Sequence, residues 1–560
     1  GNAGTGDVSV KANNIDAVNN GINVDTGPST GNFTVDVNKI TSSDNGIYGF
    51  ASGDGDVNIT VRDSIVADDN GIWFDVDASV GAGSVNIDVG NINAGLVGID
   101  LDTNANTTDL TITANDITSG ASGVRFTHGG SGDISVTAHD IDAGFIGVWF
   151  DTAASTHDLT IDVNSIKSGD DGIYGFHSGD GEVNITVRDS IVSGDDGIEF
   201  YADNAAVGKV NITVNDVKGR DNGVYVGTAS AALADQTLND LNVTTTGHIE
   251  AGAGWGIWTQ TNDNVLTNIT VKNGSVIESA SGLAIGNSIG DSHVIIENAT
   301  ELVDDPNTVE KNSVNGRVLL GLGGDRLDLH GGFSGITEVN GGYGGTNTDD
   351  ILNLYDANST YNANNIVGWD VFNVSNSYLT LDGPLGNLNV GTAGVAGTGI
   401  FLTNGSTLES NQHGLNILGN LTLDSGTTFL SDVNDDAGNP GRGDTYITGF
   451  LTNGGTVSIA DGAADDDLQV NGLYTGNNGT LVVDTVLGGD TSATDTMTFL
   501  GGTAEGATSV VVNNIGGTGA QTVEGIKIIN VSGASDGAFS LVGDYEIAGP
   551  YLHFRAAPVQ

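Results

Sequence analysis

The chain has 560 residues, and its 71 acidic and 16 basic residues give a formal net charge of −55 at pH 7. This charge argues against nucleic acid as a partner, because phosphate binding depends on lysine and arginine. No apolar run approaches the ~18–20 residues of a membrane helix, so we expect no membrane insertion by this segment. Because there is no cysteine, disulfides, zinc–thiolate sites and thiol nucleophiles are excluded.

Residues 7–226 repeat a unit of 24–27 residues. Each unit has a strand-like run such as residues 57–61, then an acidic or small turn, a glycine and a second short strand such as residues 72–74. The turn glycines are Gly21, Gly46, Gly71, Gly98, Gly123, Gly147, Gly172, Gly197 and Gly223. A near-constant period with two strand patterns and no helical pattern predicts a solenoid. We predict an all-β, right-handed parallel β-helix, an elongated rod with a C-terminal cap, and we expect the turn glycines to supply positive φ angles.

A longer repeat lies on top of the coil repeat. Residues 45–72 return, with few changes, at residues 171–198, a shift of 126 residues or five coils. A solenoid is easily extended in this way, because each coil contacts only its neighbours. The sequence therefore indicates duplication of a five-coil block.

We divide the chain into four parts. Residues 1–300 hold regular coils of about 25 residues, and residues 301–315 leave the pattern and are interpreted as a loop or boundary. Residues 316–478 hold less regular coils, with short alternating strands and Gly/Asn turns. Residues 479–560 are predicted to form a cap that covers the open edge of the last coil, since an uncovered edge invites strand addition by another chain.

The C-terminal half carries the motifs of a known family. These motifs are the Gly-Gly and Gly-Trp-Asp coils at residues 323–329 and 368–370, and the segments 479–490, 510–522 and 537–541. They resemble the passenger domains of Gram-negative autotransporters and their pertactin-like C-terminal autochaperone region. The resemblance implies export through the outer membrane to the cell surface or beyond, by way of the protein's own C-terminal outer-membrane barrel. We interpret the chain as a passenger whose last residues are a truncated linker to a missing translocator barrel.

One outward column is the main candidate for a ligand-binding face. If the residue after each turn glycine points inward, the next one points outward, and strands ~4.8 Å apart align these residues in a column. The column is Asn23, Tyr48, Trp73, Asp100, Arg125, Trp149, Tyr174, Glu199, Tyr225 and Trp258. Its aromatic members Tyr48, Trp73, Trp149, Tyr174, Tyr225 and Trp258 are the candidate ligand-binding residues, with Asp75, Asp151 and Glu199 as neighbouring carboxylates. Such a face suits sugars or extended protein ligands; alternatively the rings stack between coils and stabilise the sheet by ~0.5–1.5 kcal/mol per pair.

Acidic turns supply a second candidate. Asp170, Asp171, Asp195 and Asp196 precede two turn glycines, where their oxygens could hold calcium weakly or remain solvated. They also resemble the paired aspartates of polygalacturonases, which use carboxylates as acid and base. Because these pairs recur with the repeat and no accompanying motif is present, we expect no enzyme, and no cofactor beyond a weakly held calcium.

Arg442, Gly443 and Asp444 form an integrin-type tripeptide. The alternative is an ordinary loop with an acidic residue before a strand, because glycine and aspartate are abundant in this chain.

We therefore predict a secreted surface adhesin that binds a host glycan or extracellular-matrix protein through many weak contacts. Such a protein would have a role in virulence. A second hypothesis is self-association of passengers, leading to bacterial aggregation and biofilm formation. At a net charge of −55 this would need divalent cations or hydrogen-bonded Asn/Thr edges. A remote third is a polysaccharide-degrading β-helix enzyme.

Overall fold

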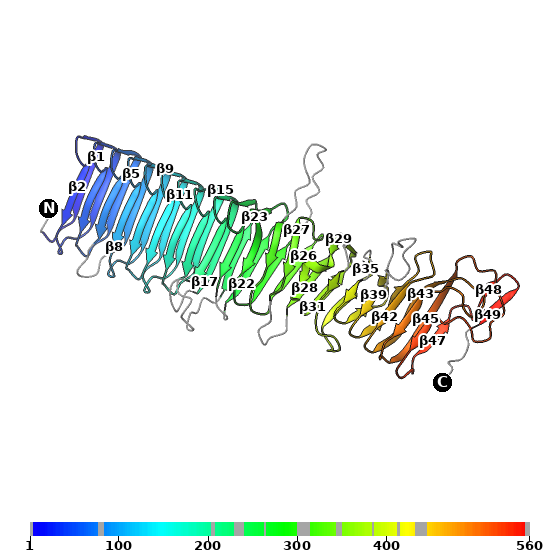
Figure 1. The fold of residues 1–560 in the computed structure, drawn as a ribbon. Helices are drawn as coiled ribbons and strands as arrows, with labels where there is room; N and C mark the ends of the chain where they lie inside the picture. Colours follow the sequence, from blue (N-terminus) through cyan, green and yellow to red (C-terminus); the bar gives the residue numbers. More distant parts are fainter. Residues whose placement is uncertain are drawn as a thin grey trace. The chain divides into compact units, whose positions relative to one another are not determined.

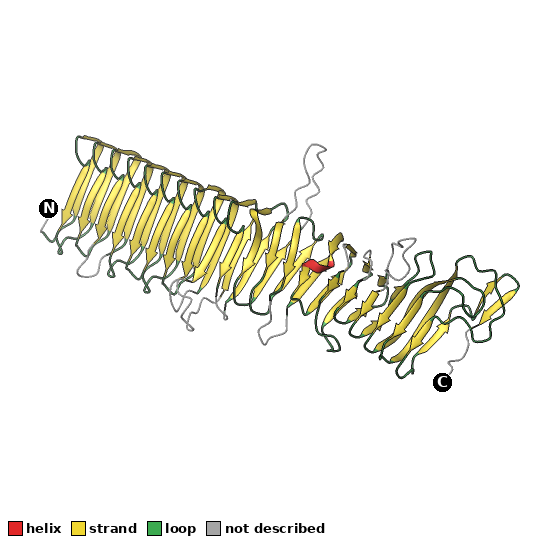
Figure 2. Cartoon of the chain, in the orientation of Figure 1, coloured by secondary structure: helices red, strands yellow, loops and turns green. Residues whose placement is uncertain are grey.

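The computed structural model describes residues 4–76, 83–202, 208–228, 240–261, 265–298, 314–342, 350–382, 386–410, 415–431 and 445–554. Strands dominate these residues, and the one helix among them is a single 3-10 turn, η1 (Ala363–Asn365), shown in red in Figure 2. The chain divides into unit 1 (Gly1–Ile295 with Ser313–Gly321) and unit 2 (Ile296–Asn312 with Leu322–Gln560). Among the described residues, no helix is long and apolar enough to cross a membrane.

Unit 1 is a parallel β-solenoid in which each regular coil contributes one long and one short strand. The long strands are β1 (Val8–Ala17), β3 (Phe33–Ser42), β5 (Val57–Ala67), β7 (Val85–Ala94), β9 (Leu110–Ser119), β11 (Ile134–Ala143), β13 (Leu159–Ser168), β15 (Val183–Val192) and β17 (Lys209–Gly219). The short strands are β2 (Ile22–Thr26), β4 (Ile47–Ala51), β6 (Ile72–Val76), β8 (Ile99–Thr103), β10 (Val124–His128), β12 (Val148–Thr152), β14 (Ile173–His177), β16 (Ile198–Ala202) and β18 (Val224–Thr228).

The strands of unit 1 pair in parallel with those of the next coil. Long strand β5 pairs with β7, and short strand β4 pairs with β6. Figure 1 shows these strands side by side in chain order, from blue to green. Less regular strands follow: β19 (Asp240–Thr245), β20 (His248–Ala251), β21 (Ile257–Gln260), β22 (Leu266–Val271), β23 (Val276–Asn287), β24 (Ser292–Ile296) and β25 (Val314–Leu319). This arrangement confirms the predicted parallel β-solenoid. The first two residues of β25, 314 and 315, belong to the segment expected to be a loop or boundary, whose other residues lie outside the described part.

The long strands show why this sequence bends into coils. In β5, Val57, Ile59 and Val61 point inward and are buried, as strand alternation requires. The alternation then breaks, because Arg62 and Asp63 are both exposed, and the register shifts there relative to β7. The strand turns at this point and returns its later apolar residues to the same core. Inward phenylalanines stack within that core; the rings of Phe126 and Phe150 lie 5.7 Å apart.

The turn glycines of unit 1 correct one expectation. None of the nine, all of which the structure describes, has a positive φ. Close approach is the reason for glycine instead: a Cβ on Gly46 would lie 2.4 Å from the carbonyl oxygen of Gly71 and 2.4 Å from Cγ2 of Ile65. The same conflict recurs at Gly172, with Gly197 and Ile191 at 2.4 and 2.5 Å. Stacked turns therefore leave no room for a side chain.

Unit 2 is also built of parallel strands, but its coils are less even in length: β28 pairs with β31 at a step of 20 residues (Ile351 with Val371), and β45 pairs with β47 at a step of 31 (Ala507 with Ala538). Its first strands are β26 (Arg326–His330), β27 (Ile336–Asn340), β28 (Ile351–Tyr355), β29 (Asn358–Asn362), β30 (Ile366–Val367), β31 (Val371–Ser375), β32 (Tyr378–Asp382), β33 (Asn387–Leu388), β34 (Gly399–Thr403), β35 (Thr407–Ser410), β36 (Asn416–Ile417), β37 (Leu421–Leu423) and β38 (Thr428–Leu430). The later ones are β39 (Thr445–Ile447), β40 (Leu451–Asn453), β41 (Thr456–Ser458), β42 (Asp467–Val470), β43 (Tyr474–Thr485), β44 (Thr496–Phe499), β45 (Ala504–Asn514), β46 (Ile529–Val531), β47 (Ala538–Leu541), β48 (Tyr545–Ala548) and β49 (Tyr551–Phe554). The last two form an antiparallel hairpin after the parallel stack. Here positive φ angles do occur at turns, as at Asn376 (φ 48°) and Gly368 (φ 74°).

Candidate functional site

The short strands of unit 1 place the predicted outward residues in register. Tyr48 lies opposite Trp73, Trp149 opposite Tyr174, and Tyr225 opposite Trp258. Asp100 and Arg125 continue the column between Trp73 and Trp149. All six aromatic candidates are half-buried on the surface of the solenoid. The structure thus brings them into one column, which we call the outward column, and their role in binding stays a prediction.

A second column runs beside the first, two residues further along each short strand. Its members are Asp25, Phe50, Asp75, Asp102, Thr127, Asp151, Phe176, Tyr201, Gly227 and Gln260. Sequence reasoning included Asp75 and Asp151 as neighbouring carboxylates but missed the rings of Phe50, Phe176 and Tyr201. The same period-2 alternation that gave the outward column would have found them.

The rings of the early coils form a cluster. Tyr48 stacks on Trp73 with centroids 4.7 Å apart, and Phe50 meets the edge of Trp73 at 5.0 Å. These contacts match the structural alternative, in which rings stabilise neighbouring coils. Trp149 differs, because it takes part in no ring–ring contact among the described residues.

A hollow of about 520 Å³ opens between Trp73 and Trp149. These two residues are three strands apart in the register, which corresponds to ~14 Å at ~4.8 Å per strand. Asp100 and Arg125 lie between them in the outward column, and Asp75, Asp102 and Thr127 line the hollow from the second column. The hollow therefore presents a row of polar groups between two indoles.

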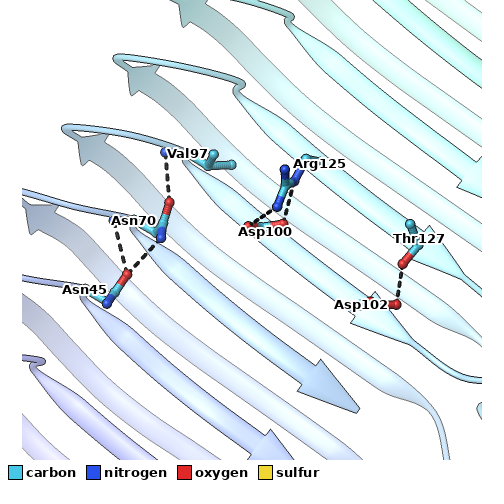
Figure 3. A network of polar contacts seen from close by, with 7 residues as sticks. All are labelled: Asn45, Asn70, Val97, Asp100, Asp102, Arg125 and Thr127. Carbon is cyan, nitrogen blue, oxygen red and sulfur yellow. Dashed lines mark hydrogen bonds and ion pairs between the residues drawn. The ribbon is translucent and has the colours of Figure 1, made fainter. Parts of the chain in front are cut away.

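The polar groups of the hollow are held by pairing between coils. Nε of Arg125 donates to Oδ1 of Asp100 at 2.8 Å, and its Nη2 donates to Oδ2 at 2.6 Å. The Asp100 side chain is 11% exposed and that of Arg125 49%, so the guanidinium covers the carboxylate. Thr127 donates its hydroxyl hydrogen to Asp102. Figure 3 shows both pairs on adjacent strands. Bidentate arginine–carboxylate pairs fix geometry as well as charge.

The turn residues that line the hollow carry no charge. In earlier coils the residue before the turn glycine is an asparagine, and Nδ2 of Asn70 donates to Oδ1 of Asn45 at 2.9 Å. The ladder ends where Oδ1 of Asn70 accepts the backbone N–H of Val97 at 3.1 Å, as Figure 3 also shows. The following turns hold Leu96–Val97, Ala121–Ser122 and Phe145–Ile146, of which Val97, Ala121, Ser122, Phe145 and Ile146 line the hollow. One wall of the hollow is thus apolar.

The turn column becomes acidic after the hollow. Asp171 and Asp196 are both buried, and the backbone N–H of Asp196 donates to Oδ1 of Asp171 at 3.1 Å. Burial raises the pKa of Asp171 to about 7 and the pKa of Asp196 to about 6. Carboxylate oxygens of Asp170, Asp171 and Asp195 lie within 4.8 Å of one another. This donor set could accept a hard cation, and the calcium expectation stays a prediction.

Aromatic rings cover the later coils. Tyr201 stacks on Phe176 at 5.0 Å and lies 5.5 Å from Tyr225. The Tyr201 hydroxyl donates to Glu199, and burial, followed by this carboxylate, raises the pKa of Tyr201. Tyr201 and Tyr225 occupy the positions that Asp75 and Asp100 occupy five coils earlier. The integrin-type tripeptide Arg442, Gly443, Asp444 lies outside the described residues.

The parallel coils and their outward column define a β-solenoid protein with an extended surface face. Residues 447–554 match the family described as Autochaperone Domain Type 1. The Adhesin BmaC autotransporter of Brucella suis biovar 1 (strain 1330) is 41% identical over 162 residues, 28% of this chain and 5% of that protein. The Probable autotransporter YfaL of Escherichia coli (strain K12) is 40% identical over 162 residues, 28% of this chain and 11% of that protein. The Uncharacterized protein YdeU of the same strain is 52% identical over 89 residues, 16% of this chain and 19% of that protein.

These matches confirm the family resemblance. The chain is an autotransporter passenger with an autochaperone region, exported through the outer membrane to the surface of a Gram-negative bacterium. It spans less than a fifth of the length of the relatives named above.

Proposed function

We propose that this surface passenger is an adhesin whose outward column in unit 1 binds a host glycan or an extracellular-matrix protein. The observation that carries the proposal is the outward column, where half-buried rings alternate with polar groups in strict register. The relative BmaC bears the description of an adhesin, which supports the same class of function. The autotransporter relatives also support a translocating outer-membrane domain elsewhere in the full-length protein.

Affinity would come from many modest contacts along the face. The accessible part of each half-buried ring offers a flat apolar surface, and the neighbouring carboxylates accept hydrogen bonds from hydroxyl or amide groups. Repeated weak contacts on one rigid support combine into a strong attachment. The role is non-catalytic: the acidic pairs that resemble a hydrolase motif recur at the same turn position in two successive coils of the second copy, and the first copy has Asp-Asn at the same positions.

The test replaces Trp73, Trp149 and Tyr174 together with alanine and measures binding to an array of glycans and matrix proteins. We expect loss of the ligands that the wild-type protein captures. The matched control is Tyr378→Ala, which removes an exposed tyrosine of unit 2 and should leave the array pattern unchanged. Retention of every ligand by the triple variant would mean that the column is only structural.

Self-association is the second candidate, and a polar ladder on the long strands favours it. Nδ2 of Asn211 donates to Oδ1 of Asn184 at 2.9 Å, and Nδ2 of Asn242 donates to Oδ1 of Asn211 at 2.9 Å. Such a ladder gives a flat, hydrogen-bonding surface that a second copy could meet. Cell aggregation that a chelator abolishes, with host binding unchanged, would favour this function over adhesion to the host and would also support calcium at Asp170, Asp171, Asp195 and Asp196.

A further inference from the structure

We propose that the hollow between Trp73 and Trp149 is a discrete subsite for a short, uncharged oligosaccharide. The inference rests on the proposed function, that the face of unit 1 binds ligands. It goes further by naming one place on that face and one chemical class.

The two indoles lie at opposite ends of the hollow, where each can contact one end of a ligand. Tyr48 stacks on one face of Trp73, while the hollow lies on the side of Trp73 toward Asp100. Trp149 closes the other end, half-buried and without a ring partner among the described residues. The C–H face of a pyranose ring is apolar and matches a flat indole, so each end of the hollow can seat one sugar ring.

The groups between the indoles suit hydroxyl recognition. Sugar hydroxyls both donate and accept hydrogen bonds. Asp75 and Asp102 offer acceptors, and the exposed part of the Arg125 guanidinium offers donors. Pairing with Asp100 and Thr127 holds Arg125 and Asp102 in place before a ligand arrives. Preorganised polar groups of this kind lower the entropic cost of binding.

Charge selects against acidic sugars. Asp75, Asp100 and Asp102 outnumber the one cation of the hollow, Arg125, whose charge is already balanced by its bidentate carboxylate partner. A sialylated, sulfated or uronic ligand would meet like charge both here and in the long-range field of a chain with a net charge of −55. The apolar wall of Ala121, Phe145 and Ile146 adds no anion site. At about 520 Å³ the hollow falls within the ~300–1,000 Å³ of small-ligand pockets.

The second copy of the duplicated block suggests a substitution that would block the hollow. Five coils later, Tyr201 stands where Asp75 stands, and its ring stacks on Phe176. Asp75→Tyr would bring a ring to the rim of the hollow and fill the space beside Trp73. This variant adds a side chain found at the same place in the fold, so it tests occlusion without opening the core.

The experiment uses isothermal titration calorimetry of the whole chain with free neutral di- and trisaccharides of glucose, galactose and mannose, and with sialylated and sulfated counterparts. We expect at least one neutral sugar to bind, with an affinity that changes little between low and high salt, because screening acts on charged partners. Trp149→Ala and Asp75→Tyr should each weaken this binding about tenfold or more, as when a central aromatic anchor is lost. Tyr378→Ala, which removes an exposed tyrosine of unit 2 outside the outward column, should bind as the wild type does.

The outcomes separate the two proposals. Preference for acidic sugars, or neutral-sugar binding unchanged in both hollow variants, overturns the glycan subsite while leaving adhesion intact. If no sugar binds but a matrix protein is captured on the array in a salt-sensitive way, the subsite fails and the adhesin proposal holds through a basic protein ligand. Capture of nothing in either assay overturns both.

Discussion

The two copies of the duplicated block carry different surfaces on one backbone. In the first, Tyr48 and Trp73 stack and an open hollow follows; in the second, Glu199 replaces Trp73 and Tyr201 replaces Asp75, so rings and a carboxylate cover the same place. The inward residues keep their character, as Phe74 and Phe200 are both fully buried. The comparison teaches that the core and turns specify the coil, while outward residues can change without altering it. The oligosaccharide subsite proposed above would therefore be confined to a few coils.

The largest expected difference between the copies is in how their stability depends on pH, and it comes from a core residue. His177 is fully buried where the first copy has Ala51, its Nδ1 lies 2.8 Å from Oγ1 of Thr152, and its Nε2 has no hydrogen-bond partner among the described residues. Burial lowers the pKa of His177 from 6.5 to about 4, although Asp158 and Asp180 act in the opposite direction. The neutral form is favoured in the fold, so stability is fully present above pH ~6.5 and is lost as pH falls toward 4.

His177→Ala should remove this acid sensitivity. The wild type should lose about 3 kcal/mol from this group between pH 7 and pH 4, whereas the variant, although less stable at pH 7 because of the cavity, should show a flatter profile. Chemical denaturation midpoints at pH 4, 5, 6 and 7 measure the effect. Leu159→Ala, which opens a cavity in the same core without removing a titratable group, is the control and should keep the wild-type slope; parallel curves for His177→Ala and wild type would contradict the account.

The turn glycines should behave alike in both copies. Gly46→Ala and Gly172→Ala would each place a Cβ 2.4 Å from a backbone carbonyl oxygen of the next coil. Because backbone cannot move aside without shifting the stack, each should destabilise the protein by about 1–3 kcal/mol. Thermal unfolding followed by circular dichroism measures the loss. The control is Gly274→Ala, at an open turn where an added Cβ meets no atom and only the positive φ causes strain. An unchanged melting temperature for both Gly46→Ala and Gly172→Ala would show that close stacking of coils is not the reason for glycine.

The turn residues should also give the two copies a different dependence of stability on pH, with a smaller effect than that of His177. Asn45 and Asn70 of the first copy correspond to Asp171 and Asp196, whose pKa values burial raises to about 7 and about 6. The protonated acids are favoured in the fold, so their contribution is fully present below pH ~3.8 and is lost as pH rises to ~7. These acids therefore lose their stabilising contribution as pH rises, whereas His177 loses its contribution as pH falls.

Asp171→Asn combined with Asp196→Asn should therefore stabilise the protein at pH 8 and not at pH 4. We expect about 1–2 kcal/mol at pH 8, less than the pKa shifts alone imply because water screens the turns. Melting temperatures at the two pH values provide the measurement. Asp68→Asn, at an exposed turn residue of the first copy, should show no such difference; an equal shift at both pH values in the double variant would argue against buried, protonated acids.

The sequence predicts the fold well because its information is repeated. A glycine every 24–27 residues sets the coil, and alternation then places Tyr48, Trp73 and Trp149 in one column. The predicted reason for the turn glycines, a positive φ angle, was wrong. The actual reason is the close approach of backbone between coils, which is visible only in the three-dimensional structure. The hollow could not be predicted either, because it depends on how Arg125 lies over Asp100 and on the small turn at Ala121, neither of which has a periodic signature.

The most direct measurement exchanges the outward residues of the two copies. In one variant Trp73 and Asp75 are replaced by the residues of the second copy, Trp73→Glu with Asp75→Tyr; in the other, Glu199→Trp with Tyr201→Asp gives the second copy the residues of the first. Titration of each with the neutral oligosaccharide or array ligand that the wild type binds tests whether function is local to the first copy. We predict that the first exchange abolishes binding and that the second leaves it at wild-type strength or adds to it. Full binding by the first variant, with its fold intact by circular dichroism, would contradict the account.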